Sequence, residues 1–199
     1  MNQKEFIDFY NNNFLPVYAD MVAFIADKPA QIIIEIENTF SHITQYLNTA
    51  NTLEIQTSNL EKAYNHLLRA TIDCYKILWV AMSEEIEVFM GDYNSRKFSV
   101  NLSENEAMYL WMQFKTNAQE ARRIELAGIG IQPEGAIEAY KKTIEIGWQL
   151  LKNCDREKLK ALKTFSFKSL MKQQWIGFLV GVASSALVTY LFTVYGSQP

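Results

Sequence analysis

The chain has few of the residues on which most enzymes depend. Its 199 residues include only 2 histidines, 2 cysteines and 8 glycines. It lacks a His-Glu-x-x-His or Cys-x-x-Cys motif for a metal and a Gly-rich loop for a phosphate. Cys74 and Cys154 lie 80 positions apart without metal-ligand spacing, so we expect two reduced thiols, no metal and no cofactor. These absences favour a protein that is not an enzyme.

The last part of the chain lacks charge altogether. Residues 175–195, WIGFLVGVASSALVTYLFTVY, would form a helix of ~31 Å, close to the ~30 Å hydrocarbon core of a bilayer. Trp175, Tyr190 and Tyr195 lie at or near its ends, where aromatic rings prefer the headgroup layer. We therefore predict a transmembrane helix over 173–195, a buried core helix being the alternative. The N-terminus lacks a signal-peptide pattern, which predicts a cytosolic body.

Charge is divided unevenly along the chain. Residues 1–151 carry 12 basic and 20 acidic side chains, a net charge of −8, whereas residues 152–172 carry 7 basic and 2 acidic ones, a net charge of +5. Basic residues next to a span favour the cytoplasmic side and attract anionic headgroups. We predict a single-pass protein with a cytoplasmic N-terminus; the alternative is a solvated basic helix face. The basic collar, at the headgroups or around a pore entrance, comprises Arg156, Lys160, Lys163, Lys168 and Lys172.

The body is predicted to be all-α. Apolar residues recur at steps of three and four, and no alternating strand pattern interrupts them. We expect a cytosolic bundle of four or five long helices over 1–152, a basic amphipathic juxtamembrane helix over 153–172 and the span over 173–195. Residues 91–102 are predicted to form a loop or a short hairpin. Helix starts are predicted at Pro29, at the capping boxes Ser58–Glu61 and Ser103–Glu106, at Pro133 and at Asp155.

The sharpest polar cluster in the body is His66, Arg69 and Asp73, whose spacing places them on one helix face. They would form either a polar pocket for a phosphate or a structural hydrogen-bond network. A helical bundle with arginine and histidine resembles the HEPN ribonucleases, whose active site has an arginine four to six residues before a histidine. Neither His42 nor His66 follows an arginine at that spacing. The resemblance thus implies a related fold without the nuclease activity, and the acidic body predicts no direct nucleic-acid binding.

Small residues form a ridge along the predicted span. Steps of four keep them on one slowly drifting helix face, and small residues allow close helix contact in lipid. We predict that this small-residue ridge packs spans together or lines a pore; the alternative is a monomeric anchor of moderated hydrophobicity. The ridge comprises Gly177, Gly181, Ser185, Thr189 and Thr193, with Ser184 beside it.

The segment before the span alternates lysines with apolar residues such as Leu159 and Leu162. Two arrangements are open: a helix lying in the headgroup plane, or a rigid stalk continuous with the span. Because neither glycine nor proline separates body from span, mechanical coupling between them is expected under either arrangement.

In size, helix content and single C-terminal span, the chain resembles the small accessory membrane proteins of type VI-B CRISPR loci. These pair a divergent HEPN-like helical body with one span. The resemblance extends over the whole length and depends on architecture. It implies an oligomeric membrane pore in the bacterial inner membrane that strengthens RNA-guided antiphage defence, with an RNA-guided effector as partner.

Two functions follow from the sequence. The first is an oligomeric membrane effector, whose cytosolic bundle assembles and whose spans perturb or perforate the membrane. The second is a tail-anchored adaptor, whose bundle binds a protein partner and whose span only localises it.

Overall fold

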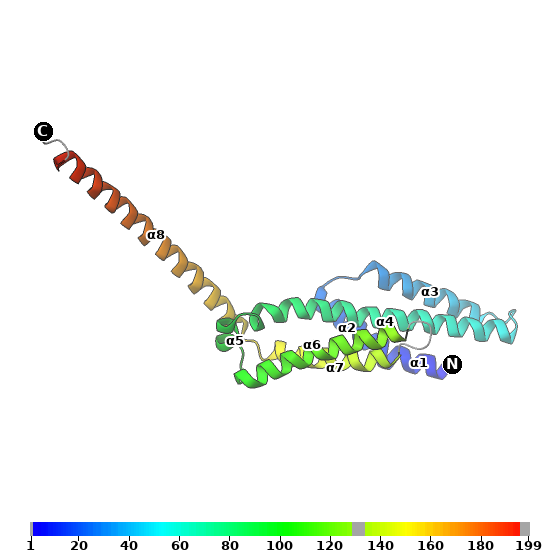
Figure 1. Cartoon of the computed structure of the whole chain (residues 1–199). Coiled ribbons are helices and arrows are strands. Elements are labelled where there is room, and N and C mark those ends of the chain that lie inside the picture. The colour runs from blue at the N-terminus through cyan, green and yellow to red at the C-terminus, as the bar shows by residue number, and fades with distance from the viewer. Residues whose placement is uncertain (1, 129–133, 196–199) are drawn as a thin grey trace.

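The computed structural model describes residues 2–128 and 134–195, except for the side chains of residues 134, 166, 167, 169, 170, 173, 183 and 186–195. The described residues are helical apart from short connections, and their only bridge is an isolated antiparallel one between Val100 and Cys154. The prediction of an all-α protein is therefore confirmed (Figure 1). The elements are α1 Gln3–Phe9, η1 Tyr10–Phe14, α2 Leu15–Ile25, α3 Ala30–Leu47, α4 Leu53–Met90, α5 Tyr93–Ser99, α6 Glu104–Ala127, α7 Glu134–Lys152 and α8 Arg156–Tyr195.

The chain begins with a helix that widens into one π-helical stretch. Residues 10–14 form η1, and Leu15 N–H donates to the carbonyl of Tyr10, five residues earlier. Pro16 explains this widening, because it has no N–H and its ring would collide with the carbonyl of Asn12 in an α-helix. The helix ends at Ala26, which is left-handed with φ 53°.

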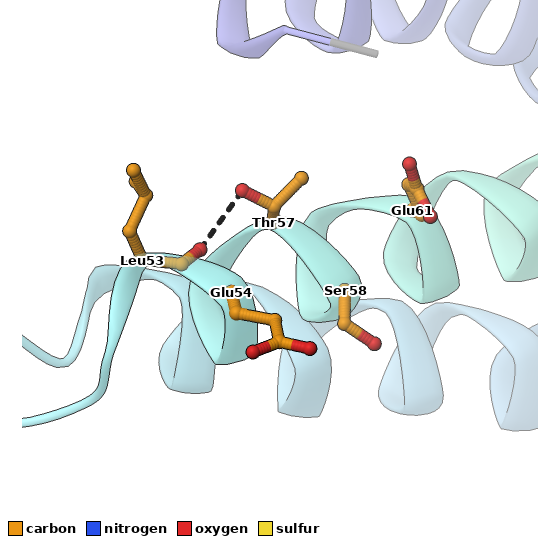
Figure 2. Close-up of a pocket in the computed structure, with 5 residues that line it drawn as sticks. All are labelled: Leu53, Glu54, Thr57, Ser58 and Glu61. Carbon is orange, nitrogen blue, oxygen red and sulfur yellow. Dashed lines mark hydrogen bonds between the residues drawn. The ribbon is translucent and has the colours of Figure 1, made fainter.

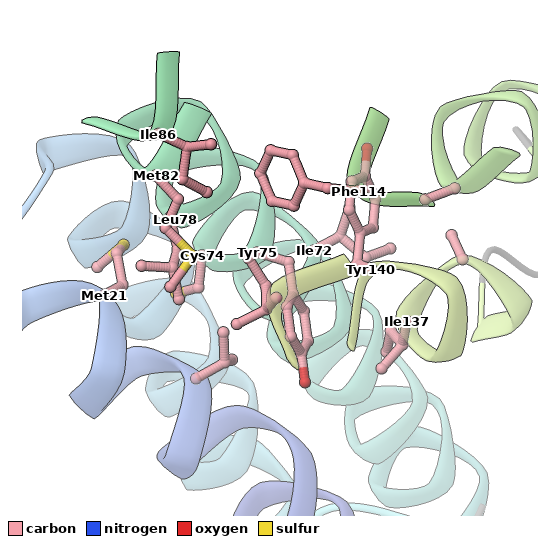
Figure 3. Packing of buried hydrophobic residues seen from close by; sticks show 14 of the residues in the cluster. Met21, Ile72, Cys74, Tyr75, Leu78, Met82, Ile86, Phe114, Ile137 and Tyr140 are labelled. Carbon is pink, nitrogen blue, oxygen red and sulfur yellow. The ribbon is translucent and has the colours of Figure 1, made fainter. Parts of the chain in front are cut away.

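Helix α4, 38 residues long, is the element on which the others pack. Its first half lies against α3, where Thr39 and Ala63 meet, and its second half contributes core side chains that α2, α6 and α7 cover (Figure 3). Leu78, Met82 and Ile86 recur at steps of four and are fully buried. One apolar stripe along α4 thus supplies a continuous core.

Some predicted boundaries need correction. Helix α4 begins at Leu53, where the Thr52 hydroxyl accepts from Ile55 N–H, so the predicted start at Ser58 and Glu61 is wrong. A good cap six residues earlier lets the helix begin there, and Ser58 becomes an interior residue.

Residues 91–102 also differ from the predicted loop or hairpin. Asp92 caps α5 by accepting from Ser95 N–H at 2.7 Å. The Ser103–Glu106 capping box is confirmed at the start of α6. The predicted helix start at Pro133 lies outside the described residues.

Helix α8 leaves the bundle and extends away from it (Figure 1). It is a single helix of 40 residues, ~60 Å long at ~1.5 Å per residue. Near its base Leu159 packs against the core, and the described side chains from Lys163 to Ser185 are exposed. The predicted juxtamembrane and spanning segments therefore form one unbroken helix.

Helix α7 packs tightly on the core at Gly147, where a larger side chain should destabilise the bundle. A Cβ at Gly147 would lie 2.9 Å from Met82 Sδ and 3.0 Å from Phe114 Cε2. Gly147→Leu should lower the free energy of unfolding by roughly 1–3 kcal/mol through overpacking, as measured by denaturant unfolding of the full chain in detergent. The control is Val182→Leu on α8, whose side chain is 52% exposed. If both variants shift the denaturant midpoint of unfolding equally, Gly147 is not required for the close packing of α7 on the core.

Candidate functional site

The base of α8 is fixed to the bundle by a short antiparallel backbone pairing. Asn101 N–H donates to Asn153 O at 2.8 Å, and Asp155 N–H donates to Ser99 O at 2.6 Å. Asp155 then caps α8 by accepting from Lys158 N–H at 3.0 Å. We call residues 99–101 with 153–155 the joint. Two backbone hydrogen bonds flanking a helix cap hold the helix in a defined direction.

Side chains reinforce the joint. Arg156, the first residue of α8, forms an ion pair with Glu85 on α4. Lys158 forms an ion pair with Asp155 at 3.2 Å and contacts Asn101 Oδ1 at 3.4 Å. Of the predicted basic collar, Arg156 therefore contacts the bundle, which sequence spacing could not reveal because Glu85 lies 71 residues away.

The rest of the basic collar points into solvent. Lys160 lies 3.9 Å from Glu157, and both side chains are largely exposed. Lys163, Lys168 and Lys172 are exposed and form no ion pair within the described residues. Along a straight helix, Arg156 lies ~25 Å and Lys168 ~8 Å before residue 173. If residues 173–195 cross a bilayer as predicted, a headgroup layer about 5–8 Å thick would reach only Lys168 and Lys172 of the collar.

The first part of the small-residue ridge is open. A Cβ built at Gly177 or Gly181 meets nothing within 4 Å. The hydroxyls of Ser184 and Ser185 donate to carbonyls of their own helix, those of Val180 and Gly181. This face is therefore shallow, and both of its serine hydroxyls already have acceptors within α8. The side chains of Thr189 and Thr193 lie outside the described residues.

Away from the ridge, this part of α8 exposes apolar side chains. Among the described residues, no helix combines the length and the hydropathy that crossing a membrane requires. The side chains of 186–195, in the second half of the predicted span, are not among them. The exposed apolar residues of this part are Met171, Trp175, Ile176, Phe178, Leu179, Val180 and Val182.

The predicted cluster of His66, Arg69 and Asp73 does not come together as one site. His66 Nδ1 lies 2.6 Å from Glu35 Oε2 on α3, and Asp73 accepts from Lys76 Nζ at 2.7 Å. Arg69 is exposed, and its side chain forms no ion pair or hydrogen bond within residues 2–128 and 134–195. The three residues share a helix face, but His66 and Asp73 bond to different neighbours and Arg69 bonds to none within the described residues.

Sequence reasoning missed the partners of His66. The His42 ring stacks on the His66 ring with centroids 5.4 Å apart, and His42 Nδ1 lies 2.9 Å from Asn59 Oδ1. Glu35 is buried and sits seven residues before His42. Polar residues at 35, 39 and 42 follow the helical repeat along the inner face of α3, which was the available signal. They form a polar seam between α3 and α4.

A second polar network joins α4, α6 and α7 at Glu125. Its carboxylate accepts from Arg122 at 2.8 Å, from Tyr140 Oη at 2.9 Å and from Lys76 at 3.2 Å. Burial raises the pKa of Glu125, but these hydrogen bonds outweigh it and hold the pKa below its ordinary value. Burial and Glu125 also raise the pKa of the Tyr140 hydroxyl. No group of metal-ligating side chains occurs among the described residues. This network is saturated internally and stabilises the bundle.

An open depression of about 470 Å³ lies on the first turns of α4 (Figure 2). It is lined by Leu53, Glu54, Thr57, Ser58 and Glu61, and Thr57 Oγ1 donates to Leu53 O at 2.9 Å. Leu53 is 78% exposed. The lining comes from one helix alone, so it does not form a reaction centre.

No protein-family model matches the chain, and comparisons with curated proteins and with solved structures give no significant match.

The Glu125 network gives a pH-dependent prediction. Glu125→Gln should lower the free energy of unfolding by about 1–2 kcal/mol at neutral pH, since charge-assisted hydrogen bonds at a partly solvated carboxylate are lost. Because the folded pKa lies below the ordinary 4.5, the difference from the wild type is complete above that pH. It disappears as the pH falls through the lowered pKa. Urea unfolding at several pH values measures it.

Glu120→Gln is the matched control on α6, because Glu120 is exposed and lies 4.0 Å from Arg123. Its effect should stay within about 0.5 kcal/mol at every pH. If Glu125→Gln lowered the free energy of unfolding by the same amount at every pH, the stabilising role of the ionised Glu125 carboxylate would be contradicted.

Proposed function

We propose that this protein is an oligomeric single-span membrane effector, with a cytosolic bundle that assembles and spans that perturb or perforate the membrane. The observation that carries the proposal is α8, one unbroken helix from the joint to Tyr195. Its first half bears the exposed lysines, and residues 173–195 bear no charge. A helix with this division suits a cytoplasmic stalk that continues into a bilayer.

The stalk links assembly of the bundle to the span. Because the joint fixes α8 by backbone hydrogen bonds and by the Arg156–Glu85 ion pair, rotation of a bundle would be transmitted along the helix. Flexible linkers decouple two domains, whereas a continuous helix passes on orientation. Bundle packing would thus decide which face of each span meets its neighbour.

Membrane activity requires several copies, since one helix cannot enclose a channel. Gly177 and Gly181 have open space above them, and close backbone approach at such residues drives span association in lipid. Ser184, Ser185, Thr189 and Thr193 are then the pore-lining candidates, and Lys168 and Lys172 form an entrance ring. The same lysines would hold anionic headgroups.

The setting we propose is prokaryotic antiphage defence, with an RNA-guided effector as partner at the inner membrane. The sequence-level resemblance to type VI-B CRISPR accessory proteins supports this setting. The bundle's contribution would be protein recognition and self-assembly, because residues 1–151 are acidic and repel nucleic-acid phosphates.

A tail-anchored adaptor is the second candidate, and one surface of α4 favours it. A depression of about 330 Å³ is lined by Lys76, Ile77, Val80, Ala81 and Glu84. Val80 and Val88, on the same side of the helix, are 46% and 45% exposed. An apolar stripe beside charged residues suits a partner helix.

Ridge substitutions test the effector function. Gly177→Leu with Gly181→Leu should convert the oligomer to monomer in detergent, because leucine side chains keep the backbones apart. It should also abolish depolarisation of cells, measured with a membrane-potential dye. The matched control is Ile176→Leu with Val180→Leu, which has the same spacing off the ridge and should leave both readouts unchanged.

Unchanged oligomer size together with unchanged depolarisation in the ridge variant would contradict the effector function. Replacing 173–195 with an unrelated apolar span separates the two candidates. An adaptor would keep its activity after this exchange, whereas the effector would lose it.

A further inference from the structure

A cavity of about 160 Å³ lies where η1 and α2 face α7. Its rim comes from η1, α2 and α7, and its inner wall from α4. The residues that give it chemical character are Asn12, Asp20, Tyr75, Lys141, Glu145 and Trp148.

Tyr75 is the innermost polar group of this cavity. It is only 7% exposed, and its hydroxyl forms no hydrogen bond within the described residues. Its neighbour Tyr140 provides the contrast: the two rings stack with centroids 6.3 Å apart, yet the Tyr140 hydroxyl donates to Glu125. Figure 3 shows both rings inside the core. This hydroxyl bonds to no described protein group, and because the protein does not fully enclose it, it remains available to a ligand in the cavity.

Two acidic residues on the exposed rim share the cavity with that hydroxyl. Asp20 and Glu145 line the cavity, and neither forms an ion pair within residues 2–128 and 134–195. Burial raises the pKa of Asp20. Burial, then the charges of Glu138, Asp20 and Glu145, raise the pKa of Tyr75 to about 12, so its oxygen stays neutral and can accept a hydrogen bond. Lys141, on the exposed rim, only partly offsets these carboxylates.

The remaining walls suit an apolar body with a cationic end. The Trp148 ring borders the cavity and is held by edge-on contact with Phe24, at 5.5 Å between centroids. Indole rings attract cations as well as apolar groups. Asn12 lies in the π-helical stretch that Pro16 imposes, and such stretches occur frequently at functional sites.

We infer that this cavity binds a small organic amine, with its ammonium group between Asp20, Glu145 and the Tyr75 hydroxyl and its apolar part against Trp148. A closed cavity of ~150 Å³ accommodates benzene, which sets the size of the buried part at about six to eight heavy atoms. The ammonium donates, and the two carboxylates and the phenol oxygen accept. This binding is independent of the proposed membrane activity, because the cavity and α8 share no residue.

The test compares three probes of one shape and different charge: benzylamine, benzyl alcohol and benzoate. Binding to the full chain in detergent is measured by saturation-transfer NMR and by calorimetry. Benzylamine should bind, benzyl alcohol about tenfold more weakly or worse, and benzoate not at all. Asp20→Asn, Glu145→Gln and Tyr75→Phe should each weaken benzylamine binding by about fivefold or more, because each removes one acceptor.

Two further variants serve as controls. Lys141→Gln should strengthen benzylamine binding, because it removes the one positive charge from the rim, and Glu37→Gln on the exposed side of α3 should leave it unchanged. Three outcomes would each overturn the inference. They are equal binding of benzyl alcohol and benzylamine, tighter binding of benzoate than of benzylamine, and absence of binding by all three probes. Far-ultraviolet circular dichroism confirms that every variant is folded.

Discussion

The direction of α8 depends on two backbone hydrogen bonds between the chain after α5 and the chain before α8. Asn101 and Asp155 donate across this joint, and Arg156 adds an ion pair to α4. Without the joint, this 40-residue helix, whose described side chains contact the bundle only near its base, would be attached to it by Leu159 and the Arg156 ion pair. With it, the orientation of the stalk follows from the packing of the bundle. The proposed function depends on this link, because it is the route by which assembly of the bundle would act on the predicted span.

The bundle itself combines an apolar core with two polar arrangements. Leu78, Met82 and Ile86 belong to the stripe of α4 that the later helices cover. The polar seam of Glu35 and His66 fixes the register of α3 on α4, and the Glu125 network fixes α6 and α7 on α4. Both satisfy their own hydrogen bonds, which makes them structural elements. The cavity at Tyr75 differs from them because its innermost hydroxyl lacks a protein partner.

Much of the fold could be predicted from the sequence, because helical periodicity and capping are local. The all-α class and the Ser103–Glu106 cap follow from residues within a few positions of one another. The start of α4 was misplaced because Thr52 and Ser58 are both good caps and the sequence does not rank them. Helix α5 was missed because seven residues give too short a periodic signal, although Asp92 before Ser95 indicated a cap.

The candidate sites were less predictable, because their contacts join distant parts of the chain. Arg156 was assigned to the basic collar, and its pairing with Glu85 depends on how α8 meets α4. His66 and Asp73 share a face of α4, yet α3 covers one and Lys76 holds the other. No local pattern could place Tyr75 beside Asp20 and Glu145.

The most direct measurement of the central claim is the membrane depth of labels placed singly along α8 in lipid vesicles, from residue 160 to residue 185. Paramagnetic quenchers in water and in the acyl region report the depth of each label. A stalk that continues into a span predicts water exposure at 160 and 163, headgroup depth near 168–172 and a steady increase in depth to a maximum near 185. A depth that oscillates with the helical repeat, or uniform exposure to water along the whole helix, would contradict the account.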